Sequence, residues 1–274
     1  MAGRGPGGSF ADLRLRAVTG AGLALVAAAA VWAGGWPLAV LAAAAAALMV
    51  WELRRLTAGR FDLPGVLVAV GAAGACLGAE ASLLRDGLEW AGLCLLAAAV
   101  ATQGDRRFPR LALLLGGAYI AVASAALVGL RGDAAYGVEA LVWVALTVVA
   151  TDVGAYFAGR LIGGPKLWPA VSPGKTWAGL GGGVALAMAT GAVFSAVTTG
   201  TLVHEVALVS AVMAVLAQGG DLGESALKRR AGAKDSSHLI PGHGGLLDRM
   251  DGLLAAGLVA ALVTFARGKS VFIW

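Results

Sequence analysis

The sequence predicts an all-α integral membrane protein: a polytopic bundle of about nine transmembrane helices whose N-terminus is cytoplasmic. Hydrophobic residues make up 59% of the 274 residues, charged residues only 14%, and the mean hydropathy is +0.81. A soluble domain carries about 25% charged residues. The apolar residues form long, uniform runs, which suit helices and not the alternating strands of a barrel. The basic residues fall mainly on one side of these runs.

The apolar runs and the polar stretches between them define the elements in order. Residues 1–16 are Gly-rich and basic and are predicted as a cytoplasmic N-terminal tail. Run 17–33 follows basic residues, as a signal peptide would, but it is long for one, so we interpret it as the first span. The later runs are 36–51, 64–79, 88–102, 111–130, 136–157, 176–198, 202–218 and 250–266. A span needs about 20 residues, so run 88–102 is short and run 250–266 is marginal.

The distribution of basic residues tests this count. When the runs alternate across the membrane from a cytoplasmic N-terminus, 17 of the 21 Lys and Arg residues lie on the cytoplasmic side. The outer side keeps Arg85, Arg131, Arg267 and Lys269. We therefore divide the chain into the tail 1–16, the N-terminal transmembrane helices 17–130 and a C-terminal transmembrane region 131–274. The last of these contains a cytoplasmic loop at 219–251, on the side where nucleotides are found.

Residues 220–251 are the most polar part of the chain. Their acids and bases are Asp221, Glu224, Asp235, Asp248 and Asp251, with Lys228, Arg229, Arg230, Lys234 and Arg249. Such a stretch makes a poor core and a poor span. It suits a site where a divalent metal neutralises the acids and the bases hold phosphates. The composition therefore favours chemistry on a charged substrate at the cytoplasmic surface.

Spacing groups some of these side chains on shared helix faces. Asp221 and Glu224 are three residues apart, and Lys228 lies four beyond Glu224, so all three share one face of a helix. Asp248 and Asp251 repeat the spacing just before the last apolar run. A salt-bridged helix end is the alternative for the first group. Favourable interaction with a helix dipole is the alternative for Asp251.

Asp152 stands inside an apolar run, where an acid is costly and marks a functional position with a partner. A structural hydrogen bond is the alternative interpretation. Other acids lie near span ends and are interpreted as solvated or interfacial residues: Glu52, Glu80, Glu89, Glu139 and Glu205. The three histidines have no spacing typical of a zinc site.

The polar stretch also resembles a known signature. It runs Ser225, Leu227-Lys228-Arg229, Lys234-Asp235, Pro241, His243-Gly244-Gly245, Asp248-Arg249 and Asp251. This order and spacing resemble the signature of the phosphatidate cytidylyltransferases, also called CDP-diacylglycerol synthases. A second block, Ser172-Pro-Gly-Lys-Thr-Trp177, is similar to one that usually reads Ser-Pro-Lys-Lys-Thr-Trp-Glu-Gly in that family. Gly174 and Ala178 depart from it. The Gly-Lys-Thr string lacks the earlier glycine and the strand of a P-loop.

The resemblance implies an enzyme that makes CDP-diacylglycerol and pyrophosphate from CTP and phosphatidate, in a multi-pass protein of the cell (inner or plasma) membrane. It implies Mg²⁺ as the metal, with a second cation such as K⁺ as an option. The residues that would hold metal are Asp221, Asp248 and Asp152. Catalytic roles fall on Asp221, Asp248, Lys228, Arg229, Lys234 and Asp235. Substrate-binding roles fall on Ser172, Lys175, Thr176, His243, Gly244, Gly245 and Arg249. Its partners would be CTP, phosphatidate and the bilayer, without nucleic acid and with room for a homodimer.

Two other functions remain open from the sequence. One is a CTP-dependent polyprenol or lipid kinase, which would transfer the γ-phosphate instead of the cytidylyl group. The other, from a different class, is an ion or anion transporter that would use Asp152 and the charged loop. The basic residues gather on one side, and no pair of broken helices appears in matching halves, which disfavours a transporter.

Overall fold

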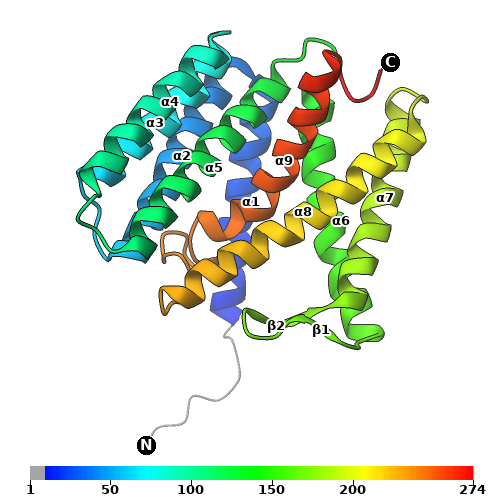
Figure 1. The fold of residues 1–274 in the computed structure, drawn as a ribbon. Coiled ribbons are helices and arrows are strands. Elements are labelled where there is room, and N and C mark those ends of the chain that lie inside the picture. Colours follow the sequence, from blue (N-terminus) through cyan, green and yellow to red (C-terminus); the bar gives the residue numbers. More distant parts are fainter. Residues whose placement is uncertain (1–9, 274) are drawn as a thin grey trace, which may run out of the picture.

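In the computed structural model, which describes residues 10–273, the chain forms a bundle of nine α-helices with one small β-hairpin (Figure 1). The helices are α1 Phe10–Ala33, α2 Gly35–Ala58, α3 Leu63–Glu80, α4 Leu84–Ala101, α5 Arg107–Arg131, α6 Gly137–Leu161, α7 Trp177–Thr198, α8 Val203–Arg230 and α9 Leu247–Arg267. The strands are β1 Lys166–Trp168 and β2 Ser172–Thr176. Ala- and Leu-rich segments form helices in a membrane because no water is there to hydrogen-bond the backbone N–H and C=O groups, which a helix pairs internally.

Eight of the helices within residues 10–273 are long and apolar enough to cross a membrane. This confirms the predicted helical membrane bundle. Helix α4, predicted as the short run 88–102, does not meet that standard, because its first turns carry Arg85, Asp86 and Glu89. It still packs closely along α3, where Gly78 and Gly87 let the two backbones touch. We therefore treat the protein as a multi-pass membrane protein.

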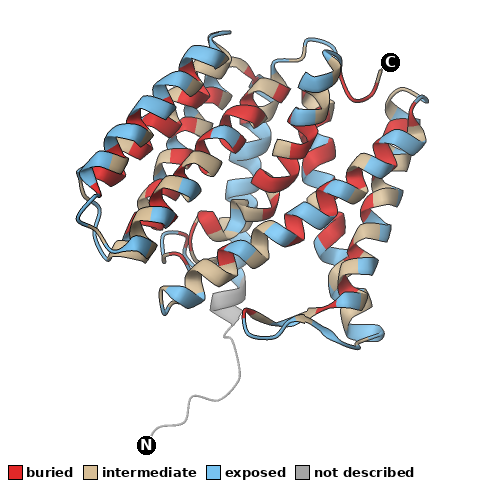
Figure 2. Ribbon diagram, viewed as in Figure 1, coloured by how far each residue is buried: buried red, intermediate tan, exposed pale blue. Residues whose placement is uncertain are grey.

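Two groups of helices make the core. Helices α2, α3 and α5 share one buried apolar cluster, and α6, α8 and α9 share another. Buried residues face inward and exposed apolar residues face outward along most helices, as expected for a bundle surrounded by lipid (Figure 2). Helix α8 crosses the bundle obliquely beside α9 (Figure 1). The acids at its polar end therefore lie between the two groups.

Three boundaries differ from the predictions. Residues 10–16, predicted as part of a tail, are the first turns of α1, whereas residues 1–9 lie outside the described residues. The loop predicted at 219–251 is shorter, because α8 continues to Arg230 and α9 begins at Leu247, which leaves 231–246. Residues 172–176 of the second block form β2 and pair with β1 in an antiparallel hairpin, which was not predicted.

Candidate active site

The polar end of α8 carries three of the predicted residues along one face. Asp221, Glu224 and Lys228 follow one another at helical spacing, as predicted. Three basic residues occupy the last turn of α8, where positive charge is favoured by the helix dipole. The helix therefore extends as a polar arm beyond its apolar part and presents these side chains to the hairpin on one side and to α9 on the other.

Lys228 joins α8 to the beginning of α9. Its Nζ lies 2.6 Å from Asp248 Oδ1 and 3.3 Å from Glu224 Oε1. The other carboxylate oxygen of Asp248, Oδ2, accepts hydrogen bonds from the Ser236 amide and hydroxyl at 2.9 Å and from the Gly245 amide at 2.8 Å. Asp248 thus holds the loop against α9, and the N–H of Gly245, a predicted substrate-binding residue, donates to this carboxylate.

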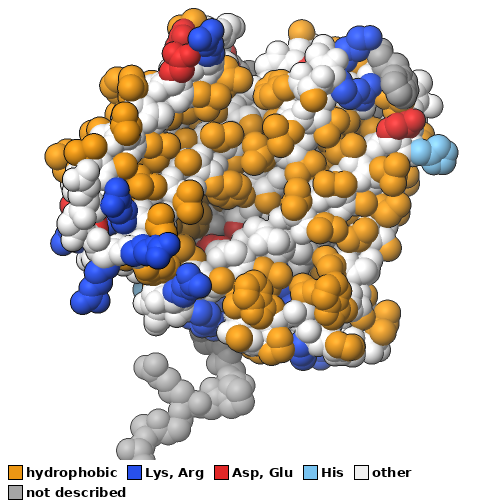
Figure 3. All heavy atoms as spheres, viewed as in Figure 1, with side chains coloured by type: hydrophobic (Ala, Val, Ile, Leu, Met, Phe, Trp, Pro, Cys, Tyr) orange, Lys and Arg blue, Asp and Glu red, His pale blue; other side chains and the backbone are white. Residues whose placement is uncertain are grey.

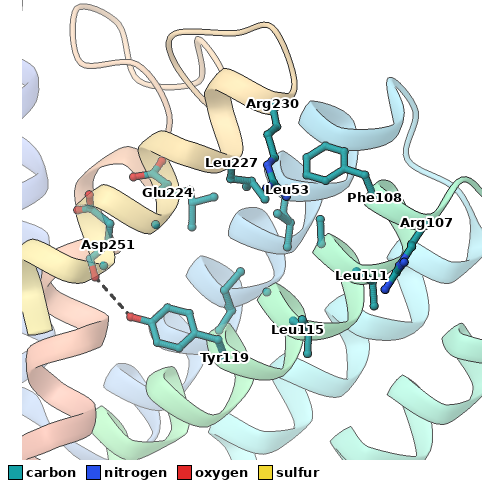
Figure 4. A pocket seen from close by; sticks show the side chains of 16 residues that line it. Leu53, Arg107, Phe108, Leu111, Leu115, Tyr119, Glu224, Leu227, Arg230 and Asp251 are labelled. Atoms are coloured by element: carbon teal, nitrogen blue, oxygen red, sulfur yellow. Dashed lines mark hydrogen bonds between the residues drawn. The ribbon is translucent and has the colours of Figure 1, made fainter. Parts of the chain in front are cut away.

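Glu224 is buried without a matching donor. Its side chain is 6% exposed, and among the described residues no group donates a hydrogen bond to either of its carboxylate oxygens. Lys228 is near but not aligned to donate. Asp251 lines the same cavity as Glu224 (Figure 4). A buried carboxylate of this kind calls for a cation or a donor from outside the chain.

A second ion pair involves Asp221, one turn before Glu224 in α8. Lys175 Nζ lies 2.6 Å from Asp221 Oδ2, and it also donates to the Gln218 carbonyl at 3.4 Å. The Gln218 amide in turn donates to Asp152 Oδ1 at 3.4 Å. Strand β2 supplies Lys175 and α6 supplies Asp152. The structure therefore brings Asp152, Lys175 and Asp221 together, although they are far apart in the sequence.

A cavity of about 640 Å³ opens beside Glu224 and Asp251, between α5 and α8. Its walls are mainly apolar and include Phe108, Leu111 and Leu115 of α5. Figure 4 shows Glu224 and Asp251 at one end, with Arg107 and Arg230 toward the other. In the space-filling view, acidic side chains are visible within a hollow of an otherwise apolar face (Figure 3). The cavity thus leads from the apolar outer surface of the bundle to the side chains of Glu224 and Asp251.

Glu52 belongs to the site, and the prediction of a solvated or interfacial residue was wrong. Its side chain on α2 is fully buried and accepts hydrogen bonds from Ser236, Ser237 and the amides that begin α9. The sequence offered one signal, an acid directly after the apolar run 36–51. Its partners lie more than 180 residues away, so no local pattern could have named them.

Comparison with known proteins gives the family. A model of the cytidylyltransferase family matches residues 14–266. The chain is 34% identical over 265 residues to "Phosphatidate cytidylyltransferase" of Brucella suis, covering 92% of this chain and 93% of that protein. It is 32% identical over 253 residues to the protein of that name from Bacillus subtilis, covering 89% and 94%. The Haemophilus influenzae protein of that name is 38% identical over 188 residues, covering 64% and 65%.

The chain belongs to the cytidylyltransferase family. It is therefore a nucleotidyltransferase enzyme embedded in a membrane, and the transporter alternative is removed. The family match covers both halves of the bundle, including α2 with Glu52. In this cytidylyltransferase the charged end of α8 lines the apolar cavity, and Leu247 and Asp251 at the beginning of α9 line it as well.

Several predicted site residues of the cytidylyltransferase lie apart from the buried cluster. Arg229, Lys234, Asp235 and Arg249 are exposed around the loop. Arg229 donates to the Ala233 carbonyl at 3.4 Å. Arg249 donates to the His243 carbonyl at 3.0 Å. The structure therefore places these side chains on the solvent-exposed surface around the loop and not beside the buried side chains of Glu224, Lys228 and Asp248.

Two predicted binding residues have structural partners. The Thr176 hydroxyl accepts a hydrogen bond from the Gly179 amide at 3.0 Å and caps the beginning of α7. The imidazole of His243 lies 3.1 Å from the Thr19 hydroxyl, which also donates to the Pro241 carbonyl at 3.2 Å. Ser172 is partly buried at the start of β2. Gly244 adopts a positive φ of +84° and turns the loop toward Asp248.

The cytidylyltransferase site has more acids than bases. Asp221 and Asp248 each contact a lysine at 2.6 Å, whereas Glu224, 3.3 Å from Lys228, accepts no hydrogen bond from the described residues. No group of three or more acids, histidines or cysteines within residues 10–273 is arranged to hold a metal ion alone. Mg²⁺ is usually held by one or two carboxylates together with substrate phosphates. The excess of carboxylates and the unsatisfied Glu224 fit a cation that shares its ligands with a substrate.

Proposed function

We propose that the protein transfers the cytidylyl group of CTP to phosphatidate, which yields CDP-diacylglycerol and pyrophosphate. The observation that carries this is the position of two lysine–aspartate pairs beside a membrane-facing apolar cavity. Relatives named phosphatidate cytidylyltransferase, similar along about nine-tenths of the chain, support the same reaction. The excess of basic residues on one side of the spans supports a site on the cytoplasmic side of the cell membrane.

The reaction joins two polyanions. A phosphate oxygen of phosphatidate forms a bond to the α-phosphorus of CTP, the bond from that phosphorus to the bridging oxygen breaks, and pyrophosphate leaves with that electron pair. Phosphatidate is already ionised, so no general base is required. The barrier is largely repulsion and positioning. Lys175 and Lys228 would hold phosphate oxygens at the centre, and Arg229 and Lys234 would receive the outer phosphates from the water side.

Mg²⁺ would be held by Asp221, with Asp152, Asp248, Glu224 and Asp251 as the nearby carboxylates. When bound, it would neutralise phosphate charge and orient the triphosphate. Lys175 and Lys228, which contact Asp221 and Asp248 in this structure, would bind phosphate oxygens of the substrates. The ion pairs of this structure therefore keep the cationic groups close to where the proposed substrates need them.

Phosphatidate would occupy the cavity between α5 and α8. The side chains of Phe108, Leu111 and Leu115 offer an apolar wall that can replace the lipid surroundings of an acyl chain. Arg107 and Arg230 carry the positive charge that attracts an anionic headgroup as it enters from the bilayer. The acidic end of the cavity would face the metal and the nucleotide.

The test uses purified protein in detergent with phosphatidate, Mg²⁺ and CTP labelled at the α-phosphate. Label in a lipid-extractable product, with one pyrophosphate released per turnover, is the expected result. Transfer from γ-labelled CTP alone would assign the protein to the lipid kinases instead. Omitting Mg²⁺ and adding it back tests the metal separately, because activity unaffected by a chelator would contradict the metal proposal alone.

A further inference from the structure

Glu52 receives hydrogen bonds on both carboxylate oxygens from a distant part of the chain. Oε1 accepts from the Ser237 hydroxyl at 2.6 Å and from the Leu246 amide at 2.9 Å. Oε2 accepts from the Leu247 amide at 2.7 Å and from the Ser236 hydroxyl at 3.2 Å. The side chain is fully buried. Each oxygen therefore meets one backbone amide and one hydroxyl, and the two amides can only donate, so each oxygen acts as an acceptor.

These bonds cap α9 from outside. The first amides of a helix have no partner within the helix, and the residue at the N-cap of α9 is Leu246, whose side chain cannot accept. Glu52 on α2 fills that role across 194 residues of sequence. A negative charge at a helix N-terminus is favoured by the helix dipole. The start of α9, which carries Asp248, is thereby tied to α2.

The same contacts lead directly to the lysine pair. The Ser236 hydroxyl lies between Glu52 Oε2 and Asp248 Oδ2, at 3.2 and 2.9 Å, and Asp248 Oδ1 contacts Lys228. The space is full: a Cβ built on Gly245 would lie 2.8 Å from Glu52 Oε1 and closer still to the Ser236 oxygen. Glu52 thus belongs to a tightly packed chain of contacts that ends at Lys228.

We propose that Glu52 is a positioning residue for catalysis, holding residues 236–248 so that Asp248 and Lys228 keep the geometry that the reaction needs. This inference rests on the proposed function, because it assigns that pair to the site of cytidylyl transfer. Glu52 does not reach the cavity or the second ion pair. Its effect passes through Ser236 and the first turn of α9.

The experiment compares Glu52→Gln with Glu52→Asp and with a matched control, Glu89→Gln. Glutamine would place an NH₂ group against one of the two backbone amides whichever way it turns, whereas aspartate keeps the charge but is shorter. Glu89 pairs on the surface with Arg85 at the far end of the bundle. Measurements are kcat per folded molecule, the KM for CTP, and deuterium exchange of peptides covering 236–248.

Glu52→Gln should lower kcat about 10- to 100-fold, the range typical of lost outer contacts around a site. Exchange at 236–248 should become faster, and Glu52→Asp should recover part of both. Glu89→Gln should match wild type. A purely structural cap would lower the yield or melting temperature and leave kcat of the folded fraction unchanged. That result, or unchanged exchange at 236–248, overturns the proposal.

Two further measurements keep the outcomes distinct. If Glu52→Gln does not fold, Ser237→Ala removes a single donor from Oε1 and should give a smaller loss of kcat in the same direction. A Ser237→Ala variant with faster exchange and wild-type kcat overturns the proposal. If wild type transfers no cytidylyl group, the proposed function fails. In that case the exchange rates and the dissociation constant of CTP still decide whether Glu52 shapes a nucleotide site.

Discussion

Lys228 Nζ lies 2.6 Å from Asp248 Oδ1, and with side chains only 12% and 6% exposed the two residues form a buried link between the end of α8 and the beginning of α9. Glu224 stands beside this link without a hydrogen-bond donor among the described residues. A buried pair is costly to break, because the remaining charge has no water to replace its partner. The link therefore has a structural role as well as a proposed catalytic one.

Lys228→Met should remove both roles. It leaves Asp248 and Glu224 buried without their cation, so the free energy of unfolding should fall by about 3–5 kcal/mol. Cytidylyl transfer should be lost. Thermal unfolding in detergent and the labelled-CTP assay measure the two effects. Lys269→Met, an exposed lysine at the other end of α9, is the control. A Lys228→Met protein with wild-type stability would contradict the buried link.

Lys175 and Asp221 should behave differently, because their side chains are 19% and 39% exposed. An ion pair open to water contributes about 0–1 kcal/mol to stability. Asp221→Asn and Lys175→Met should therefore leave the melting temperature nearly unchanged. Because Lys175 is proposed to hold a phosphate oxygen and Asp221 to hold the cation, kcat/KM should fall about 100-fold or more, as it does when charge stabilisation is removed. Full activity in both variants would refute their assignment to the site.

Thr176 should matter for folding more than for turnover. Its hydroxyl caps α7, and replacing such a cap with alanine costs about 0.5–2 kcal/mol. Thr176→Ala should lower the melting temperature while kcat of the folded protein changes little, and Thr176→Ser should restore stability. A loss of kcat at unchanged melting temperature would contradict this prediction and support the substrate-binding role that the sequence predicted for Thr176.

The lowered pKa of Asp62 determines the direction in which the stability of the protein changes with pH. The Arg54 guanidinium, 2.7 Å away, holds the pKa of Asp62 well below its ordinary value of 3.8. A lowered pKa means that the stabilising charge is fully present above pH 3.8 and is lost as the pH falls toward the folded pKa. Asp62→Asn should therefore reduce stability, by about 1–3 kcal/mol. Melting curves should show a constant difference from pH 8 to 5 and a shrinking one below about pH 4.

Arg107 and Arg230 should affect the lipid and not the nucleotide. Arg107→Gln and Arg230→Gln remove the positive charge at the mouth of the cavity, so the KM for phosphatidate should rise about tenfold, as expected for one charged hydrogen bond. The KM for CTP should stay the same. Arg85→Gln, an exposed arginine that pairs with Glu89, is the control. An equal rise for both substrates would argue against a lipid entrance here.

The sequence predicted the helical bundle well because lipid exposure leaves a strong, local signal in long apolar runs. The spacing of Asp221, Glu224 and Lys228 on one face was equally local, and the structure has it. The hairpin at 166–176 was missed because its strands are short and its residues polar. The extent of the loop was overestimated because the polar residues at the end of α8 were counted as loop.

Contacts across the bundle were beyond prediction for a different reason. Lys175 meets Asp221 only after β2 folds back against α8, and Glu52 meets Ser236 only after α9 packs on α2. Neither pairing can be predicted from a periodic pattern in the sequence, because its two residues lie in different elements. The buried charge of Glu52 looked interfacial because its position near the end of an apolar run is where solvated acids also occur.

The distance along the chain between Glu52 and its donors has a consequence for synthesis. Ser236 follows Glu52 by 184 residues, and Leu247 by 195. At about 5–20 residues per second, a ribosome needs roughly 10–40 s to add them. During that time the newly inserted α2 carries a carboxylate whose final partners do not yet exist. The amino-terminal helices can therefore reach their finished arrangement only when α9 arrives, and in a chain truncated before residue 236 the Glu52 carboxylate would lack all four of these donors.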